Sequence, residues 1–271
     1  MVRYSGKIKK DTDDLDYYTI AKKDANKKSK YYHFTTLEAL EKIVSSNSFR
    51  FSSLSIVKDP FEHNRLDNLW KKKVFVFCLT EEMSEDMWKQ YGDNANGVCL
   101  EVSKDTLCNI KIIDENNNEV SEFDGKTDQA HKTSKNISDW VQFDVSLLKV
   151  IYDDELANKY TIDEDLLEFF TGVEGVSKKD LMKRSALGYC KTCDFGFEKE
   201  TRIRLTLRPK GNEYRNGSYV IPNFDYVYGK IPLQRQIRIH LHKSSPLLEE
   251  NIVKILNNYD CHNFILKKVN R

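Results

Sequence analysis

The stretch of residues 31–51 carries the clearest pattern of apolar and polar positions in the chain. Its first four residues are typical of a strand, and apolar residues then recur at helical spacing from Leu37 to Val44. Thr35 lies three residues before Glu38, which is the spacing of a capping box at a helix N-terminus. The pattern predicts a strand, a helix that begins near Thr35, and a second strand where two phenylalanines alternate with polar residues.

Later segments predict a sheet with helices around it. Val74–Leu79 is a continuous apolar run, which is typical of a central strand covered on both faces. Ser84 has the side chain of a helix N-cap, and acidic residues follow it in the favourable first turn. Further strands are expected at residues 98–102, 145–152, 195–207, 235–241 and 264–269, and helices at residues 155–190 and 245–259. Together these segments predict an α+β fold.

The beginning of the chain differs from the rest. Residues 1–30 are rich in Lys and Asp and lack apolar periodicity, so we expect a flexible N-terminal arm with one turn near Leu15–Ile20. The length of 271 residues suits either one large domain or two small ones.

Composition is typical of a soluble chain. Charged residues make up 31% of the sequence, mean hydropathy is −0.62, and no apolar run approaches the ~20 residues that a membrane helix needs. The N-terminus lacks the apolar segment of a secretory signal, and six cysteines are scattered without framework spacing. We therefore expect a cytoplasmic protein with free thiols and no membrane partner.

Charge is distributed unevenly, although the whole chain carries only +1. Residues 201–271 hold seven Arg and six Lys against three Glu and two Asp, an excess of eight positive charges. A basic last third indicates a polyanionic partner such as nucleic acid. Solvated strand faces explain the same excess, so both interpretations stay open.

Two groups of side chains near the predicted elements are candidates for ligand binding. His33 lies at a strand end, directly before a helix N-terminus whose amide dipoles favour negative ligand groups. Trp88 and Tyr91 share one face of the short helix after Ser84, where they suit a stacking platform for a planar ring. A histidine beside a helix cap and two core aromatics are the plainer explanations.

The strand expected at residues 195–207 gathers charge on one face. Period two places Glu198, Glu200, Arg202 and Arg204 together, with neighbours ~6–7 Å apart along the strand. A solvated, salt-bridged face is one interpretation. The other is a carboxylate pair in a cleft, where a guanidinium keeps a glutamate ionised and able to accept a hydrogen bond from a sugar hydroxyl.

Metal binding has little support in the sequence. Asp59 and Glu62 lie close together on a loop, but such a loop is also a well-made turn. The Cys-x-x-Cys at residues 190–193 has no second pair, and His240 and His242 share a strand face without a third ligand. We therefore predict no metal site.

Six short motifs occur in a recognisable order. They are Tyr32-His33-Phe34-Thr35, Asp59-Pro60-Phe61-Glu62, Met87-Trp88-x-x-Tyr91, Gly97-Val98-Cys99-Leu100, Val150-x-Tyr152 and Glu198-x-Glu200-x-Arg202. As a set they resemble a large bacterial domain family of unknown function, found among abortive-infection and toxin–antitoxin genes. The resemblance covers residues 31–271 and implies a single domain there.

The first of these motifs, with the helix that follows it, also resembles the start of the diphtheria-toxin-like ADP-ribosyltransferases, some of which modify nucleic acid. This resemblance implies a split mixed β-sheet core with peripheral helices, and NAD as the cofactor consumed. It implies that His33 holds a ribose hydroxyl of NAD. Glu200 would bond the nicotinamide ribose with Glu198 as its catalytic companion, and Tyr91, or Trp88 in its place, would stack on the nicotinamide.

The resulting hypothesis is an NAD-dependent ADP-ribosyltransferase that acts as an intracellular bacterial toxin or anti-phage effector. Thr35 and Arg202 complete the expected cofactor-binding residues. Breaking the nicotinamide–ribose bond develops positive charge on the sugar, which a fixed carboxylate stabilises. The basic last third favours a nucleic-acid acceptor, RNA or DNA, over a protein. A toxin of this kind would have an antitoxin protein as a further partner.

Two other functions stay open. A metal-dependent nuclease or hydrolase would use Asp59, Glu62, Glu198 and Glu200 around a divalent ion, and would lose its activity in chelator. A non-catalytic binding module would use the basic last third as a nucleic-acid surface, and its binding would weaken with salt without any turnover.

Overall fold

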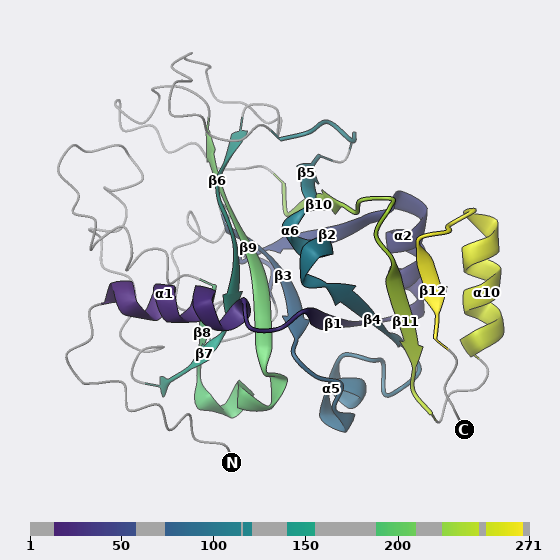
Figure 1. The fold of residues 1–271 in the computed structure, drawn as a ribbon, viewed down its shortest axis with the longest axis horizontal. Helices are drawn as coiled ribbons and strands as arrows, with labels where there is room; N and C mark the ends of the chain where they lie inside the picture. The colour runs from purple at the N-terminus through teal and green to yellow at the C-terminus, as the bar shows by residue number, and fades with distance from the viewer. Residues whose placement is uncertain are drawn as a thin grey trace.

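A curled mixed β-sheet with short helices around it forms the described part of the chain, which is therefore α+β (Figure 1). This computed structural model describes residues 14–57, 74–114, 116–120, 140–154, 188–209, 224–243 and 248–267. The helices are α1 (Asp14–Ala25), α2 (Leu37–Ser46), α5 (Glu85–Gln90), α6 (Lys104–Cys108), α10 (Leu248–Asn258) and the 3₁₀ helix η2 (Cys193–Glu198). The strands are β1 (Lys30–Thr35), β2 (Ser48–Ser53), β3 (Val74–Thr80), β4 (Val98–Ser103), β5 (Lys111–Ile113), β6 (Trp140–Lys149), β7 (Ile151–Tyr152), β8 (Cys190–Lys191), β9 (Glu200–Pro209), β10 (Tyr226–Lys230), β11 (Ile237–Leu241) and β12 (Phe264–Leu266).

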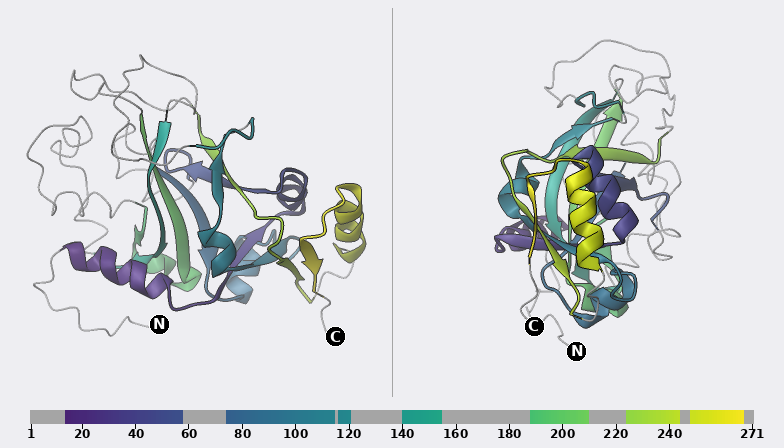
Figure 2. Two further views of the ribbon diagram at one scale, coloured as in Figure 1. Left: turned by 45° about the horizontal axis from the view of Figure 1, so that its top comes forward. Right: turned by 90° about the vertical axis from the view of Figure 1, so that its right-hand side faces the viewer.

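Ten of the described strands belong to one sheet. Its order is β12-β11-β4-β1-β3-β2-β10-β5, with β9 joined to β3 and β6 joined to β9. The described pairs in it are antiparallel except for β11 with β12, and β7 and β8 form a separate parallel pair. The long strands β6 and β9 run together at one end of the sheet, and α2 and α10 lie against each other at the opposite end (Figure 1, Figure 2).

β3 is the strand at which the sheet divides. β9 pairs with it along its whole length, from Val74 opposite Thr206 to Thr80 opposite Glu200. On the other edge of β3, β2 pairs near the beginning and β1 pairs at the end, where Tyr32 lies opposite Thr80. β1 and β2 therefore diverge from the same edge of one strand.

Buried apolar side chains form a large core on one face of the sheet and a smaller cluster on the other. β1 contributes to both, because successive side chains of a strand point to opposite faces. Tyr31 belongs to the large core, whereas Tyr32 and Phe34 belong to the smaller cluster. The other buried members of the smaller cluster are Met87, Trp88 and Cys99.

Helix α2 begins one residue later than the capping-box spacing predicts. Its N-cap is Thr36, whose Oγ1 accepts a hydrogen bond from the Ala39 amide at 3.2 Å. Thr35 instead ends β1, where it lies opposite Val98 of β4, so strand pairing holds it extended. Asn47 follows the helix in the left-handed conformation, which agrees with the predicted stop.

Helix α1 corrects the expectation for the N-terminal segment. It covers Asp14–Ala25, where a single turn was expected near Leu15–Ile20. Ala21 and Ala25 are buried, and Ala21 packs in a small cluster with Leu148 of β6. The apolar periodicity is weak because small alanines, which favour helix, take the buried positions.

The charged strand corrects a second expectation, because β9 begins only at Glu200. Residues Cys193–Glu198 form the 3₁₀ helix η2 instead. Lys199 between the two elements has a φ of 43°, a left-handed conformation that interrupts extended backbone. Glu198 is therefore not on the strand face that carries Glu200 and Arg202, although it lies beside them. Phe195 and Phe197 suit a 3₁₀ helix as well as a strand, so their alternation does not show where η2 ends and β9 begins.

Other predictions agree with the described elements. β2, β3, α5, β4, β11, α10 and β12 lie where the sequence patterns predict strands and helices, and the strand expected at residues 145–152 is β6 followed by β7. The helical segment at residues 155–190 falls almost wholly outside the described residues, and the Asp59–Glu62 loop falls entirely outside them. None of the described helices is long and apolar enough to span a membrane. The division into residues 1–30 and 31–271 stays a prediction.

Candidate functional site

A polar cluster around Glu200 lies where β3 and β9 pair. Thr80 is opposite Glu200 and Cys78 is opposite Arg202, so the four side chains share a face of the sheet. Arg202 donates from Nε to Glu200 Oε1 at 2.6 Å and from Nη2 to Oε2 at 3.1 Å. Its Nη1 donates to the carbonyl of Gly188 at 2.8 Å, and Gly188 has a φ of +79°, which only glycine adopts without strain. This forked contact holds the carboxylate in one orientation.

Lys191 joins Glu200 to a second carboxylate. Its Nζ lies 2.9 Å from Glu200 Oε2 and 2.8 Å from Glu198 Oε2. Both glutamates, Lys191 and Arg202 are buried. Two carboxylates and two cationic side chains give the cluster no net formal charge. This pairing offsets the free-energy cost of burying four charged groups.

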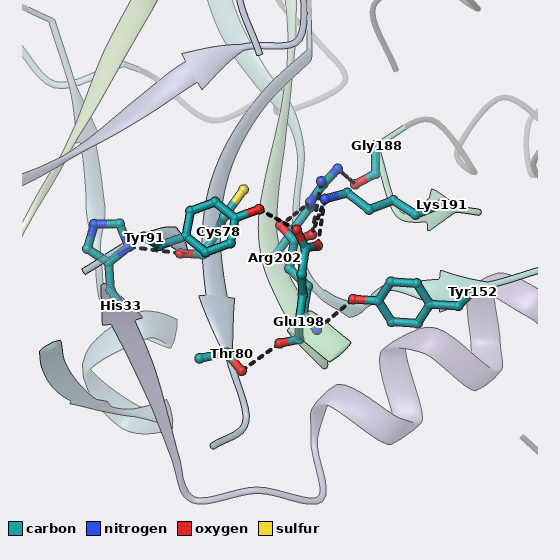
Figure 3. Close-up of polar contacts among 10 residues, drawn as sticks. His33, Cys78, Thr80, Tyr91, Tyr152, Gly188, Lys191, Glu198 and Arg202 are labelled. Carbon is teal, nitrogen blue, oxygen red and sulfur yellow. Dashed lines mark hydrogen bonds and ion pairs between the residues drawn. The ribbon is translucent and has the colours of Figure 1, made fainter. Parts of the chain in front are cut away.

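Three hydroxyl groups surround the cluster (Figure 3). Tyr91 donates a hydrogen bond to Glu198 Oε1, and Thr80 donates to the Glu198 carbonyl at 2.6 Å. The Tyr152 hydroxyl accepts from the Glu200 amide at 2.9 Å. Because Tyr91 is 42% exposed while Glu198 is buried, the tyrosine ring forms the boundary between the carboxylates and solvent.

The two glutamates of the cluster have pKa values shifted in opposite directions. Burial alone would raise the pKa of Glu200, but Arg202 and Lys191 outweigh it and hold that pKa well below its usual range. Burial and the Glu200 carboxylate raise the pKa of Glu198, against the attraction of Lys191. Glu200 is therefore ionised at neutral pH, and Glu198 takes up a proton more readily. Carboxylate pairs divided in this way are typical of acid–base sites.

His33 on β1 and Arg202 on β9 flank β3 from opposite edges (Figure 3). The His33 Nδ1 lies 2.9 Å from the Cys78 carbonyl oxygen, and its ring centroid lies 4.5 Å from that of Phe77. Burial lowers the pKa of His33 to about 4, so the imidazole is neutral at pH 7. A carbonyl oxygen only accepts, so the neutral ring carries its proton on Nδ1 and presents Nε2 as an acceptor.

Cys78 contacts both parts of the candidate site. Its carbonyl accepts from His33, and its side chain lies opposite Arg202, on the face of the sheet that carries Glu200. β1 and β9 border β3 on opposite edges, so the backbones of His33 and Glu200 lie about two strand spacings, or roughly 10 Å, apart. Tyr32, the neighbour of His33, shares the row and the face of Thr80 and Glu200, so the His33 side chain leaves β1 on the other face. A pocket common to His33 and Glu200 stays a prediction.

His33 also lines a groove of about 960 Å³ between β1, α2, β2 and β10. This volume lies near the upper end of the range for small-molecule and cofactor sites. The charged residues of its wall are the bases Lys42, Arg50 and Lys230 and the acids Glu38 and Asp114. Of the described residues in the cluster, Cys78 lines the groove, whereas Glu198 and Glu200 do not.

The predicted aromatic and hydroxyl residues lie in different surroundings. Trp88 is buried and packs edge-on against Phe34, with 4.9 Å between ring centroids, which is the core packing of the plainer explanation. Its stacking on a ligand stays a prediction. Tyr91 caps the end of α5 and belongs to the carboxylate cluster. Thr35 is buried at the end of β1 and lines the groove without capping α2.

Sequence reasoning missed three members of the site. Lys191 lies within the Cys-x-x-Cys segment, and nothing in that local pattern indicates that it reaches two glutamates. Cys78 lies inside an apolar run, where it is indistinguishable from a core residue. Tyr152 was part of one of the quoted motifs, unlike Lys191 and Cys78. Its hydrogen bond with the Glu200 amide could be seen only in the tertiary structure.

Metal and redox chemistry find no further support in the described ranges. No group of three or more His, Cys, Asp or Glu side chains among them is placed to hold a metal ion. His240 and His242 contact two different glutamates, each at 3.0 Å. Cys190 and Cys193 are not joined by a disulfide, and the Asp59–Glu62 loop lies outside the described residues.

Comparison with known proteins adds one match. Residues 87–203 match the model of a family described as a protein of unknown function (DUF2971). The matched segment contains Tyr91, Lys191, Glu198, Glu200 and Arg202, and His33 lies before it. No curated protein matches the chain, and no solved structure matches it. The match agrees with the resemblance to a domain family of unknown function, and the likeness to ADP-ribosyltransferases stays a prediction.

Proposed function

We propose that the protein is an NAD-dependent ADP-ribosyltransferase that acts in the bacterial cytoplasm as a toxin or anti-phage effector and modifies nucleic acid. The observation that carries this proposal is the buried pair of Glu198 and Glu200, which Lys191 bridges and Arg202 orients, one strand away from His33 at the groove. A neutral histidine at the groove suits a ribose hydroxyl of NAD, and an ionised carboxylate suits the sugar charge that develops when the nicotinamide leaves.

The groove is the proposed place for NAD. The His33 Nε2 is free to act as an acceptor for a ribose hydroxyl, because Nδ1 is committed to the Cys78 carbonyl. Thr36 begins α2 at the groove wall, and the amide dipoles of this ten-residue helix favour a pyrophosphate there. The groove volume of about 960 Å³ is large enough for a dinucleotide.

The carboxylate cluster supplies the proposed chemistry. The bond between nicotinamide and ribose C1′ breaks with its electron pair leaving on nicotinamide, and positive charge develops on the sugar. Glu200, which Arg202 and Lys191 keep ionised, stabilises that charge. The acceptor atom then bonds to C1′ and passes its proton to Glu198, whose pKa is raised. The exposed ring of Tyr91 beside Glu198 is the surface on which nicotinamide would stack.

The decisive test uses NAD labelled in its adenylate phosphate, incubated separately with RNA, DNA and bacterial protein. Transfer of label should fall about 100-fold or more in Glu200→Gln, because a preorganised charge is lost at the reacting centre. Glu101→Gln is the matched control, since Glu101 is an equally buried, ion-paired carboxylate outside the cluster. Wild-type transfer by Glu200→Gln, or an equal loss in a correctly folded Glu101→Gln, would refute the assignment.

A further inference from the structure

One face of strands β2 and β10, at the edge of the groove, gathers aromatic and cationic side chains. Tyr228 lies directly opposite Arg50, and Tyr226 and Lys230 lie two positions to either side of it on β10. Direct partners and alternate residues of a strand share one face of a sheet, so these four residues lie together. We call them the basic aromatic face.

Arg50 and Tyr226 of the basic aromatic face are exposed, and Tyr228 and Lys230 are half-buried. Tyr226 is 38% exposed, and the Arg50 guanidinium lies 4.4 Å from its ring centroid. Lys230 donates from Nζ to the Ser46 carbonyl at 3.0 Å, which holds it at the groove wall. Lys111 of β5 lies opposite Lys230, and its Nζ pairs with the Glu119 carboxylate at 3.0 Å, so the positive charge of the face comes from Arg50 and Lys230.

The packing beneath this face fixes which residues point outward. Val227 and Gly229 point to the opposite side, into the core. A Cβ at Gly229 would lie 2.5 Å from Ile110 Cγ2 and 2.7 Å from Phe51 Cε2, so the strand backbone approaches these side chains as only glycine allows. A slip of one residue would put both tyrosines into the core, and the register is therefore strongly specified.

We propose that the basic aromatic face binds single-stranded nucleic acid and presents it to the groove. Unpaired bases stack on tyrosine rings and guanidinium planes, and lysines neutralise the neighbouring phosphates. Two tyrosines at alternate positions of one strand stand ~6–7 Å apart, which leaves room for bases on their faces. Arg50, Tyr228 and Lys230 also line the groove that contains His33, so a base held on the face enters the same cavity.

The role of this face as an acceptor site rests on the proposed function, but the binding itself does not. Binding is therefore measured without NAD, by fluorescence anisotropy of labelled 12-nucleotide RNA and DNA oligonucleotides, single-stranded and duplex. The single strands should bind at least tenfold more tightly than the duplexes, since duplex bases are already stacked. A preference for the RNA or the DNA strand identifies the natural class of acceptor.

Variants locate the binding on the face. Tyr226→Leu and Tyr228→Leu keep apolar bulk and should each weaken single-strand binding about tenfold, because one stacked base is lost. Tyr226→Phe should bind like the wild type. Arg50→Ala should lower the slope of log Kd against log salt by about one unit. Lys254→Ala on α10 and Tyr259→Leu just after it are the matched controls and should change neither quantity.

Each outcome separates this inference from the proposed function. Unchanged binding in correctly folded Tyr226→Leu and Tyr228→Leu, or duplex binding as tight as single-strand binding, would overturn the inference alone. Single-strand binding that depends on the face, without any transfer of ADP-ribose, would leave the inference standing and refute the transferase proposal. Circular dichroism and the melting temperature of each variant exclude unfolding as the cause.

Discussion

Two buried glutamates lie in the same row across the sheet and have different surroundings. Glu101 on β4 is opposite Tyr32, Tyr32 is opposite Thr80 of β3, and Thr80 is opposite Glu200 on β9. Both glutamates are 5% exposed. Both glutamates thus lie on the same face of the sheet and are buried to the same degree. They differ in the side chains that pair with their carboxylates.

The cations beside the two carboxylates differ in their access to water. Arg238 and Lys30 pair with Glu101, and their side chains are 54% and 50% exposed. Arg202 and Lys191 pair with Glu200, and their side chains are 1% and 7% exposed. Water can therefore solvate the two cations paired with Glu101, whose third partner is the buried His240, whereas the charges around Glu200 depend on one another. Burial of the counter-ions, more than burial of the carboxylate, marks the candidate site.

The largest expected effect concerns these counter-ions. Arg202→Met should lower the free energy of unfolding by about 3–5 kcal/mol, because it leaves Glu200 buried with a weakened balance of charge. Arg238→Met should cost about 1 kcal/mol or less, because its partner carboxylate keeps other cations and the arginine is half exposed. Urea unfolding of both variants at pH 7 measures the difference. Equal losses would show that the two carboxylates are energetically equivalent and would break the comparison.

A smaller effect should appear in the pH dependence of stability. The folded pKa of Glu200 is lowered, and a glutamate in the unfolded chain titrates near ~4.3. Its contribution is therefore complete above about pH 4.3 and is lost as pH falls from there towards the folded pKa. Glu198 has a raised pKa, so its contribution is present below about pH 4.3 and is lost as pH rises through the folded pKa.

Urea unfolding between pH 2.5 and 8 separates the two terms. In Glu200→Gln the free energy of unfolding should fall less steeply as pH drops below about 4.3. In Glu198→Gln it should fall less steeply as pH rises from about 4.3 towards neutrality. Each effect is on the order of 1.4 kcal/mol for every unit by which the pKa is shifted. Glu101→Gln serves as the control with solvated partners. A Glu198→Gln curve that runs parallel to the wild type would contradict the opposite shifts.

The smallest expected effect belongs to the hydroxyl at the boundary with solvent. Tyr91→Phe removes the hydrogen bond to Glu198 and keeps the ring, so it should lower the free energy of unfolding by about 1 kcal/mol. It should also raise the pKa of Glu198 further, because the hydrogen bond from Tyr91 favours the ionised form. NMR titration of the glutamate side chains checks this shift. An unchanged pKa would mean that Tyr91 does not control the carboxylate.

Local patterns predicted much of the fold because the forces behind them act between near neighbours in the chain. Ser84 caps α5 as expected, and its Oγ accepts from the Met87 amide at 3.2 Å. The apolar run of β3 is buried as expected in a central strand. Capping and alternation fail at Thr35 and Lys199, where pairing with β4 and a left-handed residue decide the boundary.

The sequence by itself determined most of the described strands and helices, but not α1 or η2, and it named His33 and Glu200 as candidates for one site. The tertiary structure alone decided that Lys191 bridges two carboxylates and that Trp88 is a core residue. It alone also decided that Tyr226 and Tyr228 share a face with Arg50 and Lys230 at the groove. The physical reason is that burial and counter-ion distance depend on strands far apart in the chain, which pair at β3. A local pattern contains no information about which distant side chains exclude water from a carboxylate.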